Sequence, residues 1–139
     1  MPRLTLEILE GRTIETKRQL AKEISAAVCE LFVVPDPNVF THIMEIKPEN
    51  LLHRWEPRSD TAEKAGKKII YGDMAEPRLT VMFIEGRTQE QKKALVVRLT
   101  EILSRILEVE EADVMIYLME MKKNDFAVGG MFFGEKKPY

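Results

Sequence analysis

The chain has 139 residues, of which 45% are hydrophobic and 32% are charged, and its formal net charge is −2. This is the composition of an ordinary soluble globular protein, and a weak negative charge without a basic run argues against nucleic acid or an anionic membrane as a partner. No apolar run approaches the roughly 18 residues of a spanning helix, and no basic stretch precedes an apolar one near Met1, so we expect a cytoplasmic protein.

The first half of the chain predicts a strand, a helix and a second strand. Residues 2–9 alternate apolar and polar side chains, with the period of a half-buried strand. Thr13 is the expected N-cap of an amphipathic helix over 14–33, whose apolar residues recur at helical spacing. Residues 39–46, rich in β-branched and apolar side chains, predict the second strand, and 48–55 predict a turn or hairpin.

The chain then repeats this plan. Residues 2–55 align with residues 77–130 at a shift of 75 without a gap, giving 16 identities in 54 positions. Both copies open with Pro-Arg-Leu-Thr and continue with Glu-Gly-Arg-Thr eight residues after the proline. The protein is therefore a tandem duplication of one small unit.

The second copy predicts strands at 78–84 and 113–121. Between them lies a helix that begins after a capping box formed by Thr88 and Gln91. A glycine-rich turn at 126–130 follows, and an apolar segment comes after it.

The repeat divides the chain into a first unit at 1–55, a linker at 56–76 and a second unit at 77–139. Within the linker, 69–71 predict a short edge strand. The long crossover in each unit favours parallel strands. Two units side by side predict an α/β fold of the α+β two-layer type, with a four-stranded sheet and two helices on one face. A unit of this size is marginal alone and leaves one sheet face uncovered, so we expect oligomerisation.

The sequence predicts neither a disulfide nor a metal site. Cys29 has no second cysteine to pair with, and its place in the first helix predicts a small buried residue. His42 and His53 are the only histidines, which gives no metal-binding constellation. No cofactor is expected.

The two prolines that open the copies differ chemically. Removal of Met1 is expected because a small residue follows it, and Pro2 would then be a secondary amine, whereas Pro77 is a tertiary amide without a proton. A free α-amino group titrates at about 7.7–8.0, and apolar burial or a nearby guanidinium lowers that pKa. Pro2 is therefore the candidate general base, unless a retained Met1 leaves it as an amide.

The sequence resembles the 4-oxalocrotonate tautomerases, and in particular the fused members of that superfamily, which carry two units in one chain. The resemblance rests on the Met-Pro start, on Leu-Glu-Gly-Arg-Thr at 9–13 and on Glu-Met-Lys-Lys-Asn-Asp-Phe-Ala-Val-Gly-Gly at 120–130. It implies an isomerase, namely a cofactor-independent tautomerase of an α-keto acid or dienol such as 2-hydroxymuconate or phenylenolpyruvate. It also implies a homotrimer whose only partner is a small carboxylate substrate.

The resemblance assigns roles to five residues. Pro2 is the base, and Arg87 from the other unit binds the substrate and stabilises charge on oxygen. Arg12 is the matching residue at the other end of the sheet, where it either binds a carboxylate or closes its turn by bonding carbonyls. Phe126 matches the family's pocket phenylalanine. Tyr117 matches a tyrosine of the cis-3-chloroacrylic acid dehalogenases and either binds substrate or belongs to the core.

Several groups that related enzymes use are missing from this chain. Short tautomerases carry a second arginine where this chain has Phe40 in the first unit and Met115 in the second. The dehalogenases carry a glutamate where this chain has Val128 and an extra arginine where it has Ile84. Malonate semialdehyde decarboxylases carry an aspartate where this chain has Asn38 and an arginine where it has Glu85. Tautomerisation is therefore the leading expectation. A hydratase-dehalogenase or decarboxylase is the alternative enzyme, and a non-catalytic trimeric binding protein like macrophage migration inhibitory factor is the alternative class.

Overall fold

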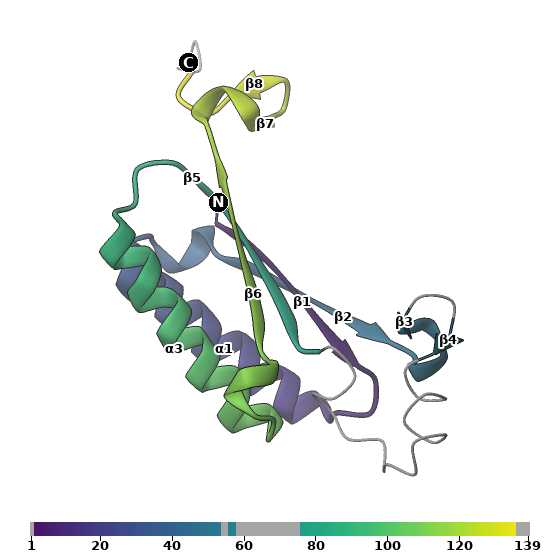
Figure 1. Ribbon diagram of the computed structural model, residues 1–139. Helices are drawn as coiled ribbons and strands as arrows, with labels where there is room; N and C mark the ends of the chain where they lie inside the picture. The colour runs from purple at the N-terminus through teal and green to yellow at the C-terminus, as the bar shows by residue number, and fades with distance from the viewer. Residues whose placement is uncertain (1, 54–55, 58–75, 136–139) are drawn as a thin grey trace.

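The computed structural model describes residues 2–53, 56–57 and 76–135, and these form two βαβ units in sequence (Figure 1). The first unit consists of β1 (Arg3–Leu9), α1 (Ile14–Phe32) and β2 (Phe40–Ile46), and the second of β5 (Arg78–Ile84), α3 (Gln89–Leu107) and β6 (Met115–Met121). Each unit ends in a small hairpin, β3 (Leu52–His53) with β4 (Glu56–Pro57) and β7 (Ala127–Val128) with β8 (Met131–Phe132). The predicted tandem order is confirmed, whereas the edge strand predicted at 69–71 lies outside the described residues.

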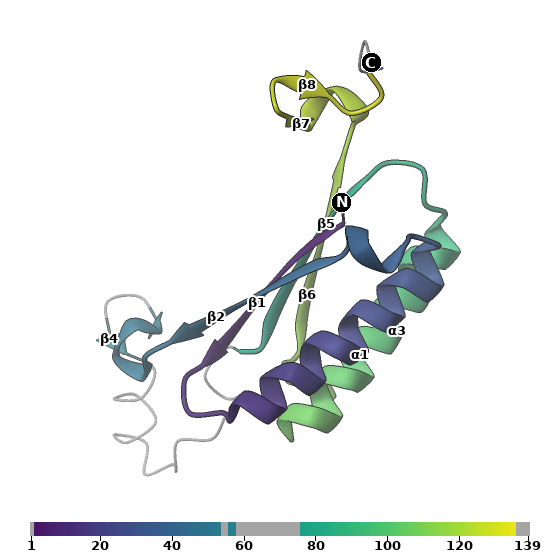
Figure 2. The ribbon, with the colours of Figure 1, turned by 180° about the vertical axis from the view of Figure 1, so that it is seen from behind.

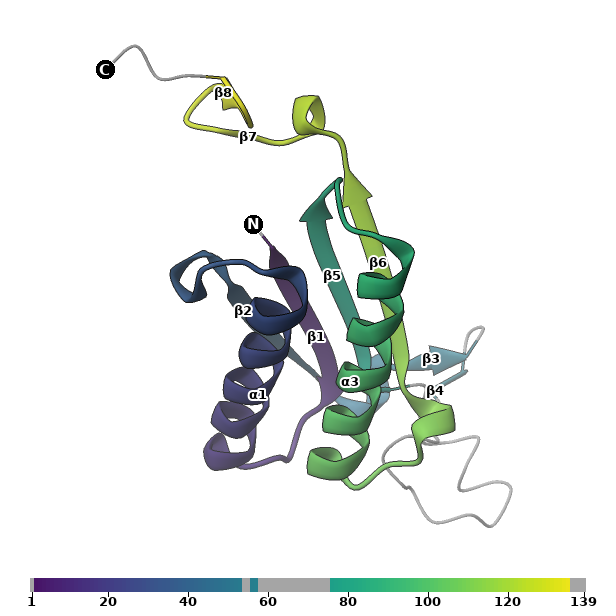
Figure 3. The same cartoon turned by 90° about the vertical axis from the view of Figure 1, so that its left-hand side faces the viewer.

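The six main elements form two layers. The sheet order is β2-β1-β5-β6, with parallel pairing inside each unit and antiparallel pairing of β1 with β5 between units. Both helices cover the same face of this sheet (Figure 3). Thr5 lies opposite Thr80, its own counterpart in the repeat, so a pseudo-twofold axis passes between these two residues.

Local signals explain the helix boundaries. The side chain of Thr13 accepts a hydrogen bond from the Thr16 N–H at 3.2 Å, and Thr88 and Gln91 form the predicted capping box. Helix α1 ends at Phe32, one residue before the predicted end, because Val33 adopts a left-handed conformation with φ of 52°.

The outer strands begin later than predicted. Strand β2 starts at Phe40 instead of residue 39, and β6 starts at Met115 instead of residue 113. In each case a short 3₁₀ helix, Asp36–Asn38 or Glu111–Asp113, precedes the strand. The next residue, Val39 or Val114, is already extended, but its N–H donates to the first carbonyl of that helix instead of to a neighbouring strand.

The core lies between the sheet and the helices and follows the repeat. Its central side chains come in pairs at the shift of 75: Leu4 and Leu79, Leu6 and Val81, Ile8 and Phe83, Leu20 and Leu95, Ile24 and Leu99, Val28 and Leu103, and Phe32 and Leu107. Two of these pairs join an aromatic to an aliphatic side chain, so one end of the core contains the aromatic residues Phe32 and Phe83 and the other end contains only aliphatic ones. These rings pack edge to face, with centroids 5.0 Å apart.

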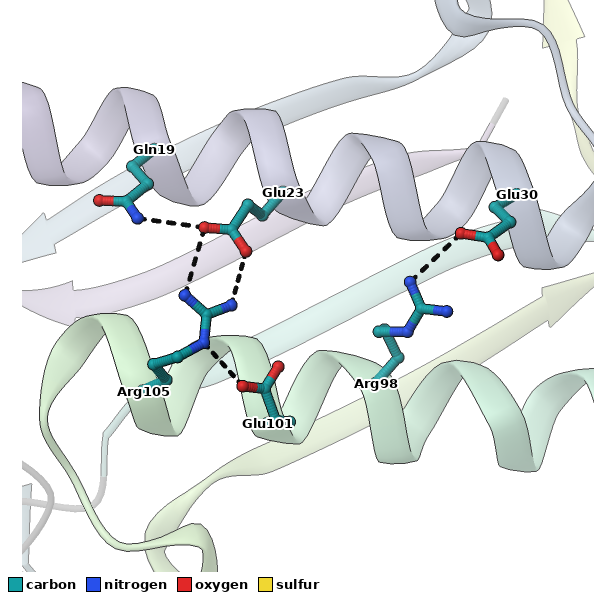
Figure 4. Close-up of polar contacts among 6 residues, drawn as sticks. All are labelled: Gln19, Glu23, Glu30, Arg98, Glu101 and Arg105. Atoms are coloured by element: carbon teal, nitrogen blue, oxygen red, sulfur yellow. Dashed lines mark hydrogen bonds and ion pairs between the residues drawn. The ribbon is translucent and has the colours of Figure 1, made fainter.

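Polar contacts join the outer faces of the two helices (Figure 4). Glu23 on α1 accepts hydrogen bonds from Arg105 on α3 at 2.5 and 3.4 Å, and Arg105 also donates to Glu101 at 2.7 Å. Glu30 accepts from Arg98 at 3.2 Å. Because Glu23 contacts Arg105 while the later Glu30 contacts the earlier Arg98, the helices run antiparallel.

The face of the sheet opposite the helices is open (Figure 2). Four large apolar side chains on this open face remain about half exposed: Phe40 at 51%, Met44 at 54%, Tyr117 at 47% and Met119 at 50%. The β7–β8 hairpin extends beyond the sheet, and its turn residues Gly129 and Gly130 have φ of 60° and 82°, which side chains with a Cβ rarely adopt. An open apolar face of this kind is typical of a surface that other chains cover.

Cys29 differs from its prediction. Its side chain is only partly buried, and the Sγ atom lies 3.9 Å from Oδ1 of Asp36. Burial and the neighbouring carboxylate both raise the pKa of the thiol. The thiol form is therefore favoured over the reactive thiolate.

Candidate functional site

Pro2 lies at one end of the two central strands. The β1–β5 register pairs Arg3 with Met82, so its continuation by one residue sets Pro2 opposite Phe83. Pro2 is buried, and its carbonyl accepts a long hydrogen bond from the Phe40 N–H at 3.5 Å. The aromatic pair formed by Phe32 and Phe83 therefore lies at the Pro2 end of the core.

Arg87 follows β5 at this same end. Its guanidinium donates to the carbonyls of Ile84 and Phe32 at 3.5 and 3.2 Å, and its Cζ lies 5.3 Å from the centroid of the Phe32 ring. Its Nε atom is buried and has no hydrogen-bond partner. Among the described residues, Arg87 forms no ion pair. At the Pro2 end, the charge of Arg87 is therefore not paired with any carboxylate of the described residues.

Arg12, the counterpart of Arg87, has a different environment at the opposite end. It also donates to the carbonyl three residues before it, that of Leu9, at 3.3 Å. It also donates to the carboxylate of Glu76, at 2.8 and 3.4 Å, and the two side chains are only 8% and 2% exposed. Glu76 also accepts from the Leu9 N–H at 3.1 Å. The charge of Arg12 is thus neutralised inside the protein.

Glu76 comes immediately before Pro77 and is therefore the repeat counterpart of Met1. In the second unit, the residue before the proline places a carboxylate on the arginine of the first unit. In the sequence, the corresponding residue before Pro2 is Met1, whose side chain has no carboxylate. Glu76 thus closes the Pro77 end with a carboxylate that has no equivalent at the Pro2 end.

Two hollows on the open side of the sheet are related by the same shift. The Pro2-end hollow, of about 400 Å³, is lined by Arg3, Met82, Met121, Asp125, Phe126 and Ala127. Their counterparts Arg78, Glu7, Ile46, Asn50, Leu51 and Leu52 all line the Pro77-end hollow, of about 510 Å³, together with Glu76, Met115 and Tyr117. Arg3, the residue after Pro2, lines the first hollow, which therefore lies at the Pro2 end of β1.

The sequence-predicted residues divide between the two ends. Pro2, Arg87 and Phe126 lie at the Pro2 end, with Phe126 in its hollow. Arg12 lies at the Pro77 end, and Tyr117 lines the Pro77-end hollow in the same chain instead of approaching Pro2.

Sequence reasoning missed three residues that set these ends apart, namely Arg3, Phe32 and Glu76. Glu76 could have been noticed from the repeat alone, because it stands before Pro77 where Met1 stands before Pro2. Phe32 could have been noticed as a core position where one half has an aromatic side chain and the other an aliphatic one. The neighbours of Arg3 depend on the strand register and could not.

In the described part of the chain, no group of three or more His, Cys, Asp or Glu side chains is placed to hold a metal ion. None of the helices described is both long and apolar enough to cross a membrane. Pro2 and Arg87 lie at the same end of the sheet as the Pro2-end hollow, although neither lines it.

A tandem βαβ fold with a proline opening each inner strand and an arginine following each inner strand defines a two-unit protein of the tautomerase type. Comparison with known families agrees: the model of the family described as "Tautomerase enzyme" matches residues 2–54 and 77–136. The chain belongs to this family of isomerases.

Single-unit relatives match part of the chain. A "probable tautomerase" of Listeria monocytogenes is 47% identical over 55 residues, which cover 40% of this chain and 90% of that protein. The "2-hydroxymuconate tautomerase" of Bacillus subtilis is 39% identical over 54 residues, covering 39% of this chain and 87% of that protein. These relatives have the length of one unit.

Solved structures of two-unit proteins match nearly the whole chain. The crystal structure of a native fused 4-OT has a TM-score of 0.79 at 21% identity and covers 94% of this chain and 95% of its own. A fused 4-OT described as a symmetric trimer has a TM-score of 0.72 at 26% identity, with 93% of each chain covered. The four-stranded sheet with two helices is thus the fold of fused tautomerases.

Proposed function

We propose that this protein is a cofactor-independent tautomerase that uses Pro2 as its base and acts on a 2-hydroxydienoate or enol of an α-keto acid. In the mature chain, Pro2 would be the first residue, and the neutral form of its amine would be the base. The name of the Bacillus subtilis relative supports an unsaturated hydroxy acid as the substrate class.

The reaction needs one proton to move between oxygen and carbon. The neutral Pro2 amine takes the hydroxyl proton of the dienol, and the O–H electron pair becomes the second bond of the carbonyl while the conjugated double bonds shift. The resulting ammonium gives the proton to a carbon atom of the substrate, so the amine is regenerated. Arg87 holds the carboxylate and stabilises the negative charge on oxygen.

The observation that carries this proposal is the difference between the two arginines. A buried guanidinium is costly without an anion, and Arg12 satisfies this need through Glu76. Arg87 has two carbonyls, an aromatic ring and an unpartnered buried Nε, but no carboxylate among the described residues. This environment supports an anionic ligand at the Pro2 end.

The first test is the intact mass of the purified protein, because loss of Met1 is required for the amine. Ultraviolet ketonisation assays should then show that Pro2→Ala lowers kcat by at least about 100-fold, the lower range for general-base catalysis. Full activity in Pro2→Ala, or a retained Met1 in an active enzyme, would exclude this mechanism.

The second test separates the two arginines. Arg87→Ala should mainly raise KM for a carboxylate substrate. The matched control is Arg12→Ala combined with Glu76→Ala, which removes both partners of the internal pair together. An equal loss of activity in the control would contradict the asymmetric site.

We also propose that three chains assemble with the open sheet faces turned inward. The half-exposed side chains of Phe40, Met44, Tyr117 and Met119 supply an apolar surface for such contacts, and the similar fused 4-OT is a symmetric trimer. Light scattering after size exclusion should give about three chain masses. A monomer at micromolar concentration would contradict this assembly.

A further inference from the structure

Side chains of the second unit bind two carbonyls at the end of α1. The last carbonyls of a helix have no partner inside the helix, and they form the negative end of its dipole. Arg87 donates to the carbonyl of Phe32 and Gln91 donates to that of Leu31, both at 3.2 Å. Helix α1 has no basic residue in its last turn, whereas α3 has Arg105 there. Arg87 therefore supplies the positive charge that the last turn of α1 lacks.

Phe32 contacts Arg87 through its ring as well as through its carbonyl. The Cζ atom of Arg87 lies 5.3 Å from the centroid of the ring, within the range of a cation–π contact. The Phe32 ring is itself fixed, because it is buried and packs edge to face against the buried ring of Phe83. One residue of the first unit thus holds a guanidinium of the second unit by two kinds of contact.

The two ends of the sheet hold their arginines with different kinds of group. The contacts of Arg12 include a full negative charge, the carboxylate of Glu76. The described contacts of Arg87 go to two carbonyls and a ring, which carry only partial charges. Partial charges can orient a guanidinium without cancelling its unit charge. The repeat counterpart of Phe32 is Leu107, which has no ring.

We propose that Phe32 is a positioning residue, which holds the Arg87 guanidinium in place and leaves its positive charge available to a carboxylate ligand. Phe32 acts through Arg87 and does not itself need to touch the ligand. The inference rests on the proposed function for the ligand, but it concerns a residue of the first unit to which that function gives no role. The Pro2 end would thus combine a cation from the second unit with its support from the first.

Two changes remove the ring contact in different ways. Phe32→Leu introduces the side chain that Leu107 already places at the matching position of the core, and it leaves the backbone carbonyl unchanged. Trifluorophenylalanine incorporated at position 32 keeps the aromatic shape, but its fluorine atoms withdraw negative charge from the ring face that attracts a cation. The matched control is trifluorophenylalanine at position 83, in the other ring of the same buried pair. The cation–π contact described for Arg87 is with Phe32.

Hydrogen exchange of the Arg87 Nε–H group measures how firmly the guanidinium is held. The Nε atom is buried and has no hydrogen-bond partner in the part of the chain that the structure describes, so its hydrogen reaches water when the guanidinium moves. Nuclear magnetic resonance of the mature protein can follow this signal, which is identified by its loss in Arg87→Lys. The exchange rate should rise about 2- to 30-fold in both variants at position 32, the factor equivalent to a cation–π contact. It should stay unchanged in the control at position 83.

Ligand binding measures whether the held charge is available. Sorbate is a conjugated dienoate and sorbamide is its neutral amide, so the ratio of their affinities reports the preference for a negative charge. Isothermal titration should show that Arg87→Ala abolishes this preference and that Phe32→Leu lowers it about 2- to 30-fold. Sorbamide affinity should be unchanged in Phe32→Leu, whereas a general defect in folding would weaken both probes alike.

The proposal would be overturned by equal exchange rates in Phe32→Leu and the unmodified protein, or by an equal acceleration in the control at position 83. Equal weakening of sorbate and sorbamide by Phe32→Leu would also overturn it. An unchanged preference in Arg87→Ala would refute the proposed function of Arg87, and the exchange rates would then still decide whether Phe32 holds the guanidinium. Because trifluorophenylalanine keeps the aromatic packing, that variant decides the question if Phe32→Leu fails to fold.

Discussion

The Arg12–Glu76 pair allows a quantitative prediction, because it is the most buried ion pair described in the protein. Glu76→Gln removes the negative charge and keeps a side chain of nearly the same size. The side chains of Glu76 and Arg12 are 2% and 8% exposed, and the closest oxygen and nitrogen atoms are 2.8 Å apart. The substitution would therefore leave a buried guanidinium without its anion.

Two independent estimates give the size of the effect. Removal of one partner of a buried pair destabilises proteins by about 3–5 kcal/mol, and two unit charges roughly 4 Å apart at an effective dielectric of about 20 attract by about 4 kcal/mol. Typical unfolding free energies are about 5–15 kcal/mol. We therefore expect Glu76→Gln to lose a large fraction of the stability and to lower Tm by about 10 °C or more.

Urea unfolding followed by circular dichroism tests this expectation, at one fixed protein concentration because assembly adds to apparent stability. The matched control is Glu7→Gln. It breaks the Glu7–Arg78 pair, whose side chains are 25% and 45% exposed, and should cost less than about 1 kcal/mol. Replacing both Arg12 and Glu76 by methionine should recover most of the loss, since no buried charge then remains. Equal losses in Glu76→Gln and Glu7→Gln would refute the reasoning.

Three further predictions concern other parts of the fold. The hydrogen bond from Arg105 lowers the pKa of Glu23 below its ordinary value. The pair therefore stabilises the protein at a pH above the ordinary pKa of glutamate, about 4.3, and this contribution is lost as the pH falls through the lowered pKa. In Arg105→Ala, the unfolding free energy should therefore fall less between about pH 5 and pH 3, which bracket that ordinary pKa. The raised pKa of Cys29 predicts slow alkylation by iodoacetamide at pH 8, and Asp36→Asn should accelerate it because one of the groups that oppose the thiolate is removed; an unchanged rate would exclude that electrostatic cause. Gly130→Ala should lower stability by about 1 kcal/mol because φ of 82° suits only glycine without strain, as thermal unfolding would reveal, and an unaltered Tm would mean that the hairpin adopts another turn.

Sequence reasoning recovered the fold because its signals were local and duplicated. The apolar periodicity of each helix, the caps at Thr13 and Thr88 and the parallel strands required by a long crossover each appeared twice in one chain. Strand starts were less accurate, since the 3₁₀ helices before β2 and β6 depend on a few turn residues that carry no periodic pattern.

The candidate site was harder to predict because it depends on pairings between distant residues. The sequence identified Arg12 and Arg87 as counterparts, but only the structure shows that Glu76 reaches back to Arg12 across 64 positions. Likewise, the strand register decides that Arg78 lies opposite Glu7 while Arg3 lies opposite Met82. Local patterns do not contain this information, because it arises from the antiparallel contact between units.

The pseudo-twofold axis between Thr5 and Thr80 determines how many sites one substitution affects in such a protein. In an assembly of identical single units, a glutamate introduced before the opening proline would appear at both ends of every dimer and would obstruct both sites at once. In the joined chain, the same glutamate is present at residue 76 only, so the pair with Arg12 forms at one end of the sheet. Covalent linkage thus allows one half to specialise as a scaffold without any loss to its twin.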